Sequence, residues 1–340
     1  MSTRPLEVLI LRELSAGELA DDPAAAWSAA GEGRRAIARR LAGLLVALDA
    51  RARVAGDPDY PSGLADLRAT APRVVFLRGG NVPEPREMVA IVGSRAASPY
   101  GLRQAGRLAG DLARIGLTVV SGLARGIDQA AHRGALDAGG RTVAVLPSGL
   151  DEVTPRHHQG LADVIAGQGT LLTEVVSGPP RYRGDFVKRN RLIAALAGST
   201  VVVEAAARSG ALSTAAAATR LGRPVLAVPG DLERETSRGC HALIRSGARL
   251  CTGAADVLEA LGAWGRAHGE SSPVASGSGS PEARLLEALG SEARTLETLA
   301  EASGLSIAET LSGLLALQWA GAAIARPGQR WARGGSPGAG

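Results

Sequence analysis

The sequence predicts a doubly wound α/β fold around a parallel sheet, and two patterns in the middle of the chain support that prediction. Six short apolar runs, rich in β-branched residues, recur at intervals: Met88–Val92, Thr118–Val120, Thr142–Leu146, Thr170–Leu172, Thr200–Val203 and Val225–Val228. Helical stretches separate several of them, namely Gly101–Ile115, Ile127–Ala138 and Val187–Ala197. Strands that alternate with helices indicate crossover connections and a parallel sheet. Strands this apolar are expected to be buried on both faces.

The boundaries of these elements follow from local chemistry. Gly116 and the pair Gly139–Gly140 stand just after two of the helical stretches, where a glycine commonly ends a helix. A further short strand is expected at Val74–Leu77, within a segment punctuated by proline. Together these elements predict a core domain over residues 54–264.

The segments on either side of the core differ from it in composition. Residues 1–53 are rich in Ala, Leu and Arg and helical in pattern, so we expect a short helical N-terminal segment there. Residues 265–280 are rich in Gly and Ser, which predicts a flexible linker. The last residues, 335–340, are expected to form a disordered tail.

A C-terminal module is predicted over residues 281–334. Leu296–Ala302 and Ile307–Leu317 are helical in pattern, and the turn Ser303–Gly304–Leu305 separates them, which is typical of a helix-turn-helix. Two short segments after residue 321 predict a small hairpin. We therefore expect a winged-helix module, with a generic three-helix partner module as the alternative.

The composition limits the classes of function. The chain has 340 residues, of which 45% are hydrophobic, and a formal net charge of +5. That length suffices for about two or three domains, and the positive charge favours a polyanionic partner. Cys240 and Cys251 form neither a metal-type spacing nor a disulfide framework, as expected in a reducing cytoplasm. No segment offers the roughly 20 apolar residues of a membrane span, so we expect a cytoplasmic protein without membrane contact or bound metal.

The most unusual segment is Arg181–Arg191, which reads RYRGDFVKRNR. Its five basic residues and one acidic residue give it a net charge of +4, and it holds Lys188, the only lysine of the chain. Tyr182 and Phe186 lie within this charged stretch. Because cations bind phosphates and aromatic rings stack on unpaired bases, the segment favours binding of a single-stranded nucleic acid. A solvated basic loop is the alternative.

Residues that follow the strands are further candidates, since ligands bind outside the carboxyl ends of the strands in an open parallel sheet. The candidates are Gly93, Ser94 and Arg95 after the first strand, Gly122 and Arg125 after the second, and Ser209 and Gly210 after the fifth. Glycine lets the backbone approach an oxyanion, and a helix N-terminus favours negative charge. The basic stretch follows the fourth strand on the same edge, so several cations are expected to converge on a multi-phosphate backbone.

Signals for catalysis are sparse. Asp128 and His132 lie four residues apart on a predicted helix, so we expect them to orient one another, with an acid–base dyad as the alternative. Glu204, at a strand end, is expected to tether the neighbouring loop, with the general base of a nucleotide hydrolase as the alternative. The second strand ends without the acidic residue that dinucleotide enzymes place on the ribose. We therefore expect no catalytic residue and no cofactor.

Six blocks of sequence resemble the DprA/Smf family of DNA-processing proteins. They are MVAIVGSRAASPYG (88–101), VVSGLARGIDQAAHRGALDAGG (119–140), FVKRNRLIAAL (186–196), VVVEAAARSGALSTAA (201–216), VPG (228–230) and SRGCHALIRSGA (237–248). Their order and spacing also agree with the family, and the resemblance runs from about Tyr60 to Leu261. It implies a Rossmann-like core, and many members of the family carry a C-terminal winged-helix module.

The resemblance also implies a function. A member of this family is expected to be a non-enzymatic, homodimeric protein that protects incoming single-stranded DNA and loads the RecA recombinase onto it during natural transformation and recombination. The basic contacts of the family fall on Arg95, Arg125, Lys188 and Arg189. The full set that we expect to contact DNA is Gly93, Ser94, Arg95, Gly122, Arg125, Phe186, Lys188, Arg189, Asn190, Arg191, Ser209 and Gly210.

The chain departs from the family pattern at several places, and none of these departures removes a basic contact. Phe186–Val187 stands where the family usually has Phe-Pro, and Pro147–Ser148–Gly149 stands where it usually has Gly-Cys-Gly. Two other functions remain open. One is an enzyme similar to nucleoside monophosphate phosphoribohydrolases, although Arg208–Ser209–Gly210–Ala211 replaces the Pro-Gly-Gly-x-Gly-Thr turn of those enzymes. The other is a nucleotide-sensing module that holds a small nucleotide without turnover.

Overall fold

The computed structural model describes residues 31–180, 182–267, 281–290, 292–319, 321–326 and 330–334. Residues 1–30, most of the predicted linker and the predicted tail therefore lie outside the described residues. The strands of the core are β1 (Ala50–Val54), β2 (Val74–Gly79), β3 (Met88–Val92), β4 (Thr118–Ser121), β5 (Thr142–Val145), β6 (Thr170–Thr173), β7 (Ser199–Val202), β8 (Val225–Ala227) and β9 (Arg249–Leu250). Its helices are α3 (Glu32–Ala47), α4 (Ser62–Ala65), α5 (Pro99–Arg114), α6 (Ile127–Asp137), α7 (Gln159–Gln168), α8 (Arg183–Leu196), α9 (Ala211–Arg220), α10 (Arg238–Arg245) and α11 (Ala254–Ala267).

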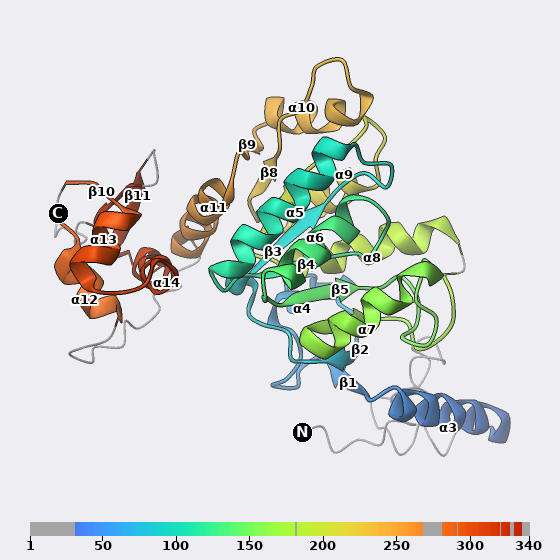
Figure 1. The fold of residues 1–340 in the computed structure, drawn as a ribbon. Coiled ribbons are helices and arrows are strands. Elements are labelled where there is room, and N and C mark those ends of the chain that lie inside the picture. The colour runs from blue at the N-terminus through green and yellow to red at the C-terminus, as the bar shows by residue number, and fades with distance from the viewer. Residues whose placement is uncertain are drawn as a thin grey trace.

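The strands of the core form one sheet, in the order β1-β2-β6-β5-β4-β3-β7-β8-β9 (Figure 1). From β6 to β9 neighbouring strands are parallel, whereas β1 and β2 join antiparallel at one side. The chain runs outward from β3 to β6 in one direction and from β7 to β9 in the other. This strand order confirms the predicted Rossmann-like, doubly wound fold.

Helices cover both faces of the sheet because successive side chains of each strand point to opposite faces. Val89 and Ile91 of β3 pack with α5, α6 and α11 on one face. Met88, Ala90 and Val92 of the same strand pack with α8, α9 and α10 on the other. Figure 1 shows α5 and α6 in front of β3 and β4. Burial on both faces explains why the central strands are apolar at every position.

The antiparallel side of the sheet differs from the sequence-based expectation. Residues 1–53 were expected to be helical, but Ala50–Val54 form strand β1, which pairs with β2 from Ala50 opposite Arg78 to Val54 opposite Val74. The predicted boundary at residue 53 thus cuts through a strand. Pairing with partners 20 to 28 residues further along the chain decides this conformation, and the local sequence gives little indication of it.

The C-terminal module has the predicted winged-helix architecture. Its helices are α12 (Pro281–Ala288), α13 (Leu296–Ser303) and α14 (Ile307–Trp319), and its small sheet joins β10 (Arg294–Thr295), β12 (Arg330–Arg333) and β11 (Ala323–Arg326). Gly304 ends α13 with a φ of +63°, a left-handed conformation that favours glycine, and so makes the turn into α14. Strands β11 and β12 are the predicted hairpin.

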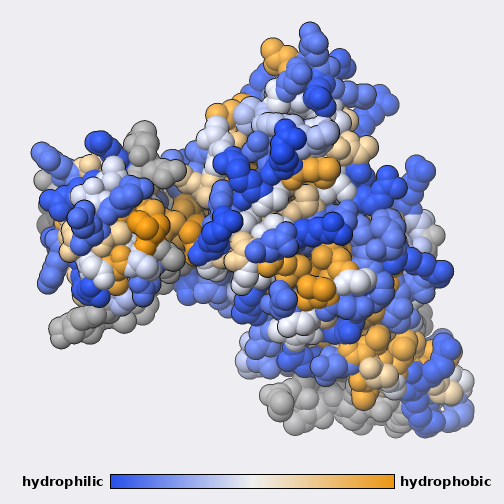
Figure 2. Space-filling view, in the orientation of Figure 1, coloured by the Kyte–Doolittle hydropathy of each residue, from blue (hydrophilic) through white to orange (hydrophobic). Residues whose placement is uncertain are grey.

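The module lies beside α11 of the core. A hollow of about 180 Å³ between them is lined mostly by apolar side chains, among them Leu258, Leu311 and Trp331. Figure 2 shows hydrophobic side chains where the module meets α11, as well as further hydrophobic patches on the core. Among the described residues, no helix combines the length and the apolar character that a membrane crossing requires.

His132 is a buried polar side chain that links α6 to strand β5. Its Nδ1 lies 2.7 Å from Oγ1 of Thr142, and that hydroxyl donates to the carbonyl of Val119, so His132 is the donor of the pair. Burial, the largest cause, together with the charges of Arg189 and His158, lowers the pKa of His132 to about 3. The imidazole is therefore neutral in the folded protein.

Acid is expected to destabilise the fold through His132. In the unfolded chain its pKa returns to about 6.5, so the unfolded state takes up the proton first, and stability falls as the pH drops below that value. Between pH 7 and pH 5 the wild type should lose about 2 kcal/mol more than His132→Asn, which keeps a donor to Thr142 and does not titrate. Urea unfolding at both pH values measures this, and equal losses in the two proteins would contradict it.

Candidate nucleic-acid interface

The carboxyl edge of the sheet has one point at which the chain leaves neighbouring strands in opposite directions, between β3 and β7. In doubly wound sheets this switch point is the usual place for a ligand. The loops that follow the two strands are joined there, because the amide of Ser94 donates to the carbonyl of Glu204 at 2.7 Å. The predicted Gly93–Ser94–Arg95 turn therefore lies directly at the switch point.

The carboxylate of Glu204 fixes the same loop from its other end. Glu204 is buried, and both of its carboxylate oxygens accept from Ser98, one from the amide at 2.8 Å and one from the hydroxyl at 2.5 Å. Ser98 is the N-cap of α5 and accepts from the amide of Gly101. A Cβ at Gly101 would lie 2.5 Å from Cδ of Glu204, so the position requires glycine. The structure thus shows Glu204 in the expected role of a tether.

A second turn packs on the first and presents another cation. Gly126 has a φ of +81°, and a Cβ there would lie 2.3 Å from the carbonyl oxygen of Ser94, so only glycine fits. The amide of Ile127 donates to that same carbonyl. Arg125, just before this glycine, is exposed, and no hydrogen bond or ion pair engages it within the described part of the chain. The turn therefore holds an available guanidinium beside the Ser94 loop.

Arg95 and Phe186, which are 91 positions apart in the sequence, are in contact in the structure. The guanidinium carbon of Arg95 lies 4.6 Å from the centre of the Phe186 ring, which is a cation–π contact. Arg95 is exposed and Phe186 is partly exposed. The contact brings the loop after β3 together with the basic stretch, as the sequence predicted for this edge.

The basic stretch is itself helical over most of its length. Helix α8 begins at Arg183, four residues before the predicted start, because the carboxylate of Asp185 accepts from the amide of Tyr182 and closes the first turn. Arg181 lies outside the described residues. Tyr182 remains 64% exposed. The stretch is thus an ordered helix rather than a solvated loop.

Two cations of α8 share one carboxylate that the sequence analysis did not consider. Nη2 of Arg191 lies 2.6 Å from Oε2 of Glu174, and Nζ of Lys188 lies 3.7 Å from Oε1. Glu174 directly follows β6, so the same rule that singled out the other loops would have found it. The predicted contacts Lys188 and Arg191 are therefore already paired in the structure.

Arg189 differs from the expectation of a DNA contact. Its side chain is buried, at 4% exposed, and Nη1 donates to the carbonyl of Gly122 at 2.7 Å and to that of Val145. Burial lowers its pKa to about 10, although the nearby carboxyl of Asp128 opposes this. The helical period turns position 189 toward the sheet, and this guanidinium binds carbonyls at the strand ends.

Gly122 belongs to the same buried arrangement, because it makes room for Arg189. A Cβ at Gly122 would lie 2.5 Å from Nη2 of Arg189, and the residue is buried. Its carbonyl accepts from Arg189. Gly122 is therefore placed to receive a guanidinium of the same protein rather than an oxyanion.

Asn190 ties α8 to the start of α9. Its Nδ2 donates to the carbonyl of Gly210 at 3.1 Å and to Oγ of Ser213 at 2.8 Å. Gly210 is the exposed N-cap of α9, and Oγ of Ser209 accepts from the amide of Ala211. The structure thus brings Ser209 and Gly210 next to the basic helix, with Asn190 as the link.

The pair Asp128 and His132 does not form the expected contact. Asp128 accepts from the amide of Ala124 at 3.3 Å, whereas His132 donates to Thr142. Burial is the main cause of a raised pKa of Asp128, and the guanidinium of Arg189 opposes it. Each side chain has a structural partner of its own. Among the described residues, no group of three or more His, Cys, Asp or Glu side chains is arranged to hold a metal ion.

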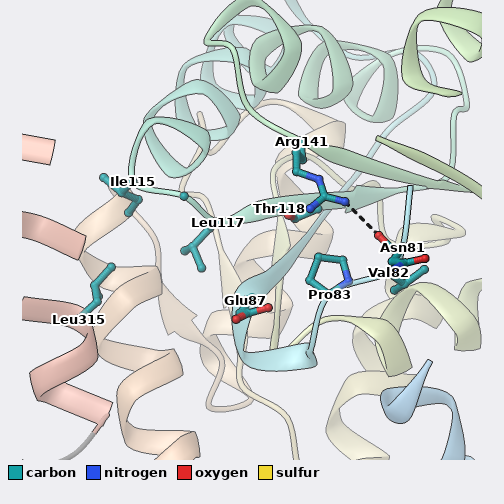
Figure 3. Close-up of a pocket in the computed structure, with 10 residues that line it drawn as sticks. Asn81, Val82, Pro83, Glu87, Ile115, Leu117, Thr118, Arg141 and Leu315 are labelled. Atoms are coloured by element: carbon teal, nitrogen blue, oxygen red, sulfur yellow. Dashed lines mark hydrogen bonds between the residues drawn. The ribbon is translucent and has the colours of Figure 1, made fainter. Parts of the chain in front are cut away.

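A separate hollow of about 430 Å³ lies at the opposite, amino edge of the sheet (Figure 3). Its wall includes Arg141, which donates to the carbonyl of Asn81 at 3.1 Å, together with Glu87. Leu315 of the C-terminal module closes one side. With one cation and one carboxylate in its wall, this hollow does not match a polyanion, and the cations that converge lie at the carboxyl edge.

Neighbouring positions 188 and 189 are expected to respond very differently to the same charge reversal. Arg189→Glu leaves two strand-end carbonyls without their donor and buries a carboxylate near Asp128, so it should cost at least about 3 kcal/mol of stability. Lys188→Glu changes a side chain that is 60% exposed and should stay within about 1 kcal/mol. Urea unfolding of both variants tests this. Equally mild effects would mean that both charges are exposed, as the sequence analysis expected.

Comparisons with known proteins agree with this fold. The family model described as DNA recombination-mediator protein A matches residues 51–262, and the model of the DprA winged helix domain matches residues 269–329. The putative DNA processing protein DprA of Mycobacterium tuberculosis is 48% identical over 246 residues, which cover 71% of this chain and 63% of that protein. Protein Smf of Escherichia coli K12 is 39% identical over 264 residues, or 76% of this chain and 71% of that protein.

Solved structures show the same likeness. The crystal structure of DNA processing protein A from Streptococcus pneumoniae superposes with a TM-score of 0.59 at 32% identity, over 76% of this chain and 93% of that one. A structure of the Helicobacter pylori protein, described for its single-stranded DNA binding mode, gives a TM-score of 0.53 at 27% identity, over 61% and 94% of the two chains. With the family model covering most of the core and relatives this similar, the chain belongs to the DprA/Smf family of DNA-processing proteins.

Proposed function

We propose that this protein binds single-stranded DNA along the carboxyl edge of its parallel sheet and loads the RecA recombinase onto it during natural transformation and recombination. The observation that carries the proposal is that separate elements present exposed cations along one edge of the sheet. Arg95 lies at the ring of Phe186, Arg125 lies on the turn that packs against Ser94, and Lys188 extends from α8 beside Glu174. The relative from Helicobacter pylori, described as binding single-stranded DNA, supports the ligand.

The chemistry of the edge fits an unpaired strand. Arg95, Arg125 and Lys188 would pair with successive phosphates, and the backbone at Ser209 and Gly210, at the N-terminus of α9, favours a further anion. Phe186 and the exposed ring of Tyr182 offer faces on which unpaired bases stack. Stacked bases of a duplex are closed to such rings, so the site favours a single strand.

Not every residue of the predicted set would touch DNA. Gly122 and Arg189 form the buried support beneath α8, and Asn190 links α8 to α9. We infer that these three position the contacting residues. Arg208, exposed beside Ser209, adds a cation that the predicted set omitted.

We infer that the function is binding, without a catalytic step or a cofactor. A phosphoribohydrolase-like reaction would need Glu204 as a carboxylate open to substrate, and both of its oxygens accept hydrogen bonds from Ser98. The family resemblance further supports a homodimer that acts in the cytoplasm with RecA as its partner. The chain spans 63% of the length of the mycobacterial relative, and these properties of the whole protein are part of the proposal.

Purified protein should bind a labelled single-stranded oligonucleotide more tightly than the matching duplex. Each neutralised phosphate of a single strand contributes a slope of about −0.7 in log K against log salt, so three contacts predict a slope near about −2. Fluorescence anisotropy over a salt series measures both quantities. Equal affinity for duplex, or an affinity insensitive to salt, would exclude the proposed mode of binding.

Charge reversal of the exposed cations should weaken binding without unfolding the protein. Lys188→Glu and Arg125→Glu are each expected to lower affinity about tenfold and to make the salt slope shallower by about 0.7. Arg114→Glu is the matched control, because Arg114 is exposed at the other end of α5, where it pairs with Asp111. Loss of affinity in Arg114→Glu equal to that in the other two would show a general charge effect and would refute the site.

A further inference from the structure

Glu174 is a carboxylate set within the basic edge of the molecule. It follows β6 directly, and its side chain is only 13% exposed. Oε2 lies 2.6 Å from Nη2 of Arg191, and Oε1 lies 3.7 Å from Nζ of Lys188. The two cations are three residues apart on one side of α8, so a single carboxylate reaches both.

The two ion pairs of Glu174 are unequal. The pair with Arg191 is short, its guanidinium is 19% exposed, and Nη1 of that guanidinium is buried without a hydrogen-bond partner among the described residues. Lys188 is 60% exposed, and its contact with Glu174 is longer than a hydrogen bond. Arg191 is therefore held in place, whereas Lys188 is held weakly and is open to exchange with solvent ions.

The phenol of Tyr60, near Arg191 and Glu174, adds no charge to this group of side chains. Tyr60 is buried and donates its hydroxyl to the carbonyl of Pro72. Burial, the largest cause, raises the pKa of Tyr60 to about 12, with Arg191 lowering it and Glu174 raising it. Tyr60 is thus neutral at ordinary pH, and the negative charge that faces Lys188 and Arg191 there is that of Glu174.

Carboxylate and phosphate oxygens compete for the same donors, because both are anionic acceptors of ammonium and guanidinium groups. We propose that Glu174 occupies Lys188 as an internal substitute for phosphate, and that a DNA phosphate displaces it from Lys188 while Arg191 stays paired. This inference rests on the proposed function of the edge. It assigns to Glu174 the role of a positioning residue that limits the affinity for single-stranded DNA, so that the bound strand can dissociate.

The proposal has a physical consequence for binding. A phosphate at Lys188 exchanges one ion pair for another and meets the remaining negative charge of Glu174 a few ångströms away. The repulsion is strongest at low ionic strength, where screening is weak. A strand bound against such repulsion leaves more readily, which suits a protein that passes its strand to a recombinase.

Glu174→Gln should bind single-stranded DNA about fivefold more tightly than the wild type at low salt, since it removes the carboxylate that competes with phosphate for Lys188. Its salt slope should be slightly steeper, because the charge of Lys188 is then no longer partly offset by Glu174. Glutamine has the same length and keeps an acceptor for Arg191, so the fold is retained. Anisotropy with a labelled oligonucleotide over a salt series gives both values, and urea unfolding confirms the fold.

Two comparisons separate this role from a general effect of charge or structure. Asp163→Asn removes one carboxylate from another ion pair, that of Arg78 with Asp163 at 2.8 Å on α7, and should leave affinity unchanged. In a Lys188→Gln background, Glu174→Gln should no longer tighten binding, because the residue through which it acts is gone.

Three outcomes would overturn the inference while the wild type binds the strand. They are an unchanged or weaker affinity of Glu174→Gln, an equal gain in Asp163→Asn, and a gain that persists in the Lys188→Gln background. Failure of the wild type to bind single-stranded DNA at low salt would instead refute the proposed function, and this inference with it.

Discussion

The buried carboxylate of Glu204 joins the two loops at which the chain leaves the sheet in opposite directions. Its backbone carbonyl holds the amide of Ser94, and its side chain holds the N-cap of α5, so the loop after β3 is tied at both ends to the loop after β7. A carboxylate in so buried a place is stable only with its oxygens satisfied. The exposed Arg95 owes its position to this loop, and the turn carrying Arg125 packs on the same backbone.

Arg189 plays the corresponding role beneath α8. Its guanidinium donates to carbonyls at the ends of β4 and β5, and it lies near the carboxyl of Asp128. Burying a cation costs free energy, which the carbonyl acceptors offset. The helix therefore has one basic residue, Arg189, that faces the sheet, whereas Lys188 beside it is exposed. We infer that the contacts of Arg189 anchor α8 against the strand ends.

The basic edge combines exposed cations with a carboxylate that partly neutralises them. Affinity of a protein for a strand rises with each cation, and a protein that delivers its strand to another also needs to release it. Under the proposed function, Glu174 between Lys188 and Arg191 would meet both needs with one side chain. The cation–π contact of Arg95 with Phe186 likewise keeps a charge and an aromatic ring together, and in the proposed complex these would meet a phosphate and its base.

Features that depend on local pattern were determined by the sequence alone. The strand Met88–Val92 was predicted with its observed bounds, and Gly304 was placed at the turn between α13 and α14, because apolar runs and left-handed glycines act over a few residues. The tertiary structure decided what depends on distant partners. Arg189 and Lys188 are adjacent cations in sequence, and only the carbonyls of Gly122 and Val145, 67 and 44 positions away, draw one of them inside. Strand β1 and the pairing of Glu174 with α8 depend in the same way on partners that are distant in sequence. The local hydrophobic pattern therefore does not predict either of them.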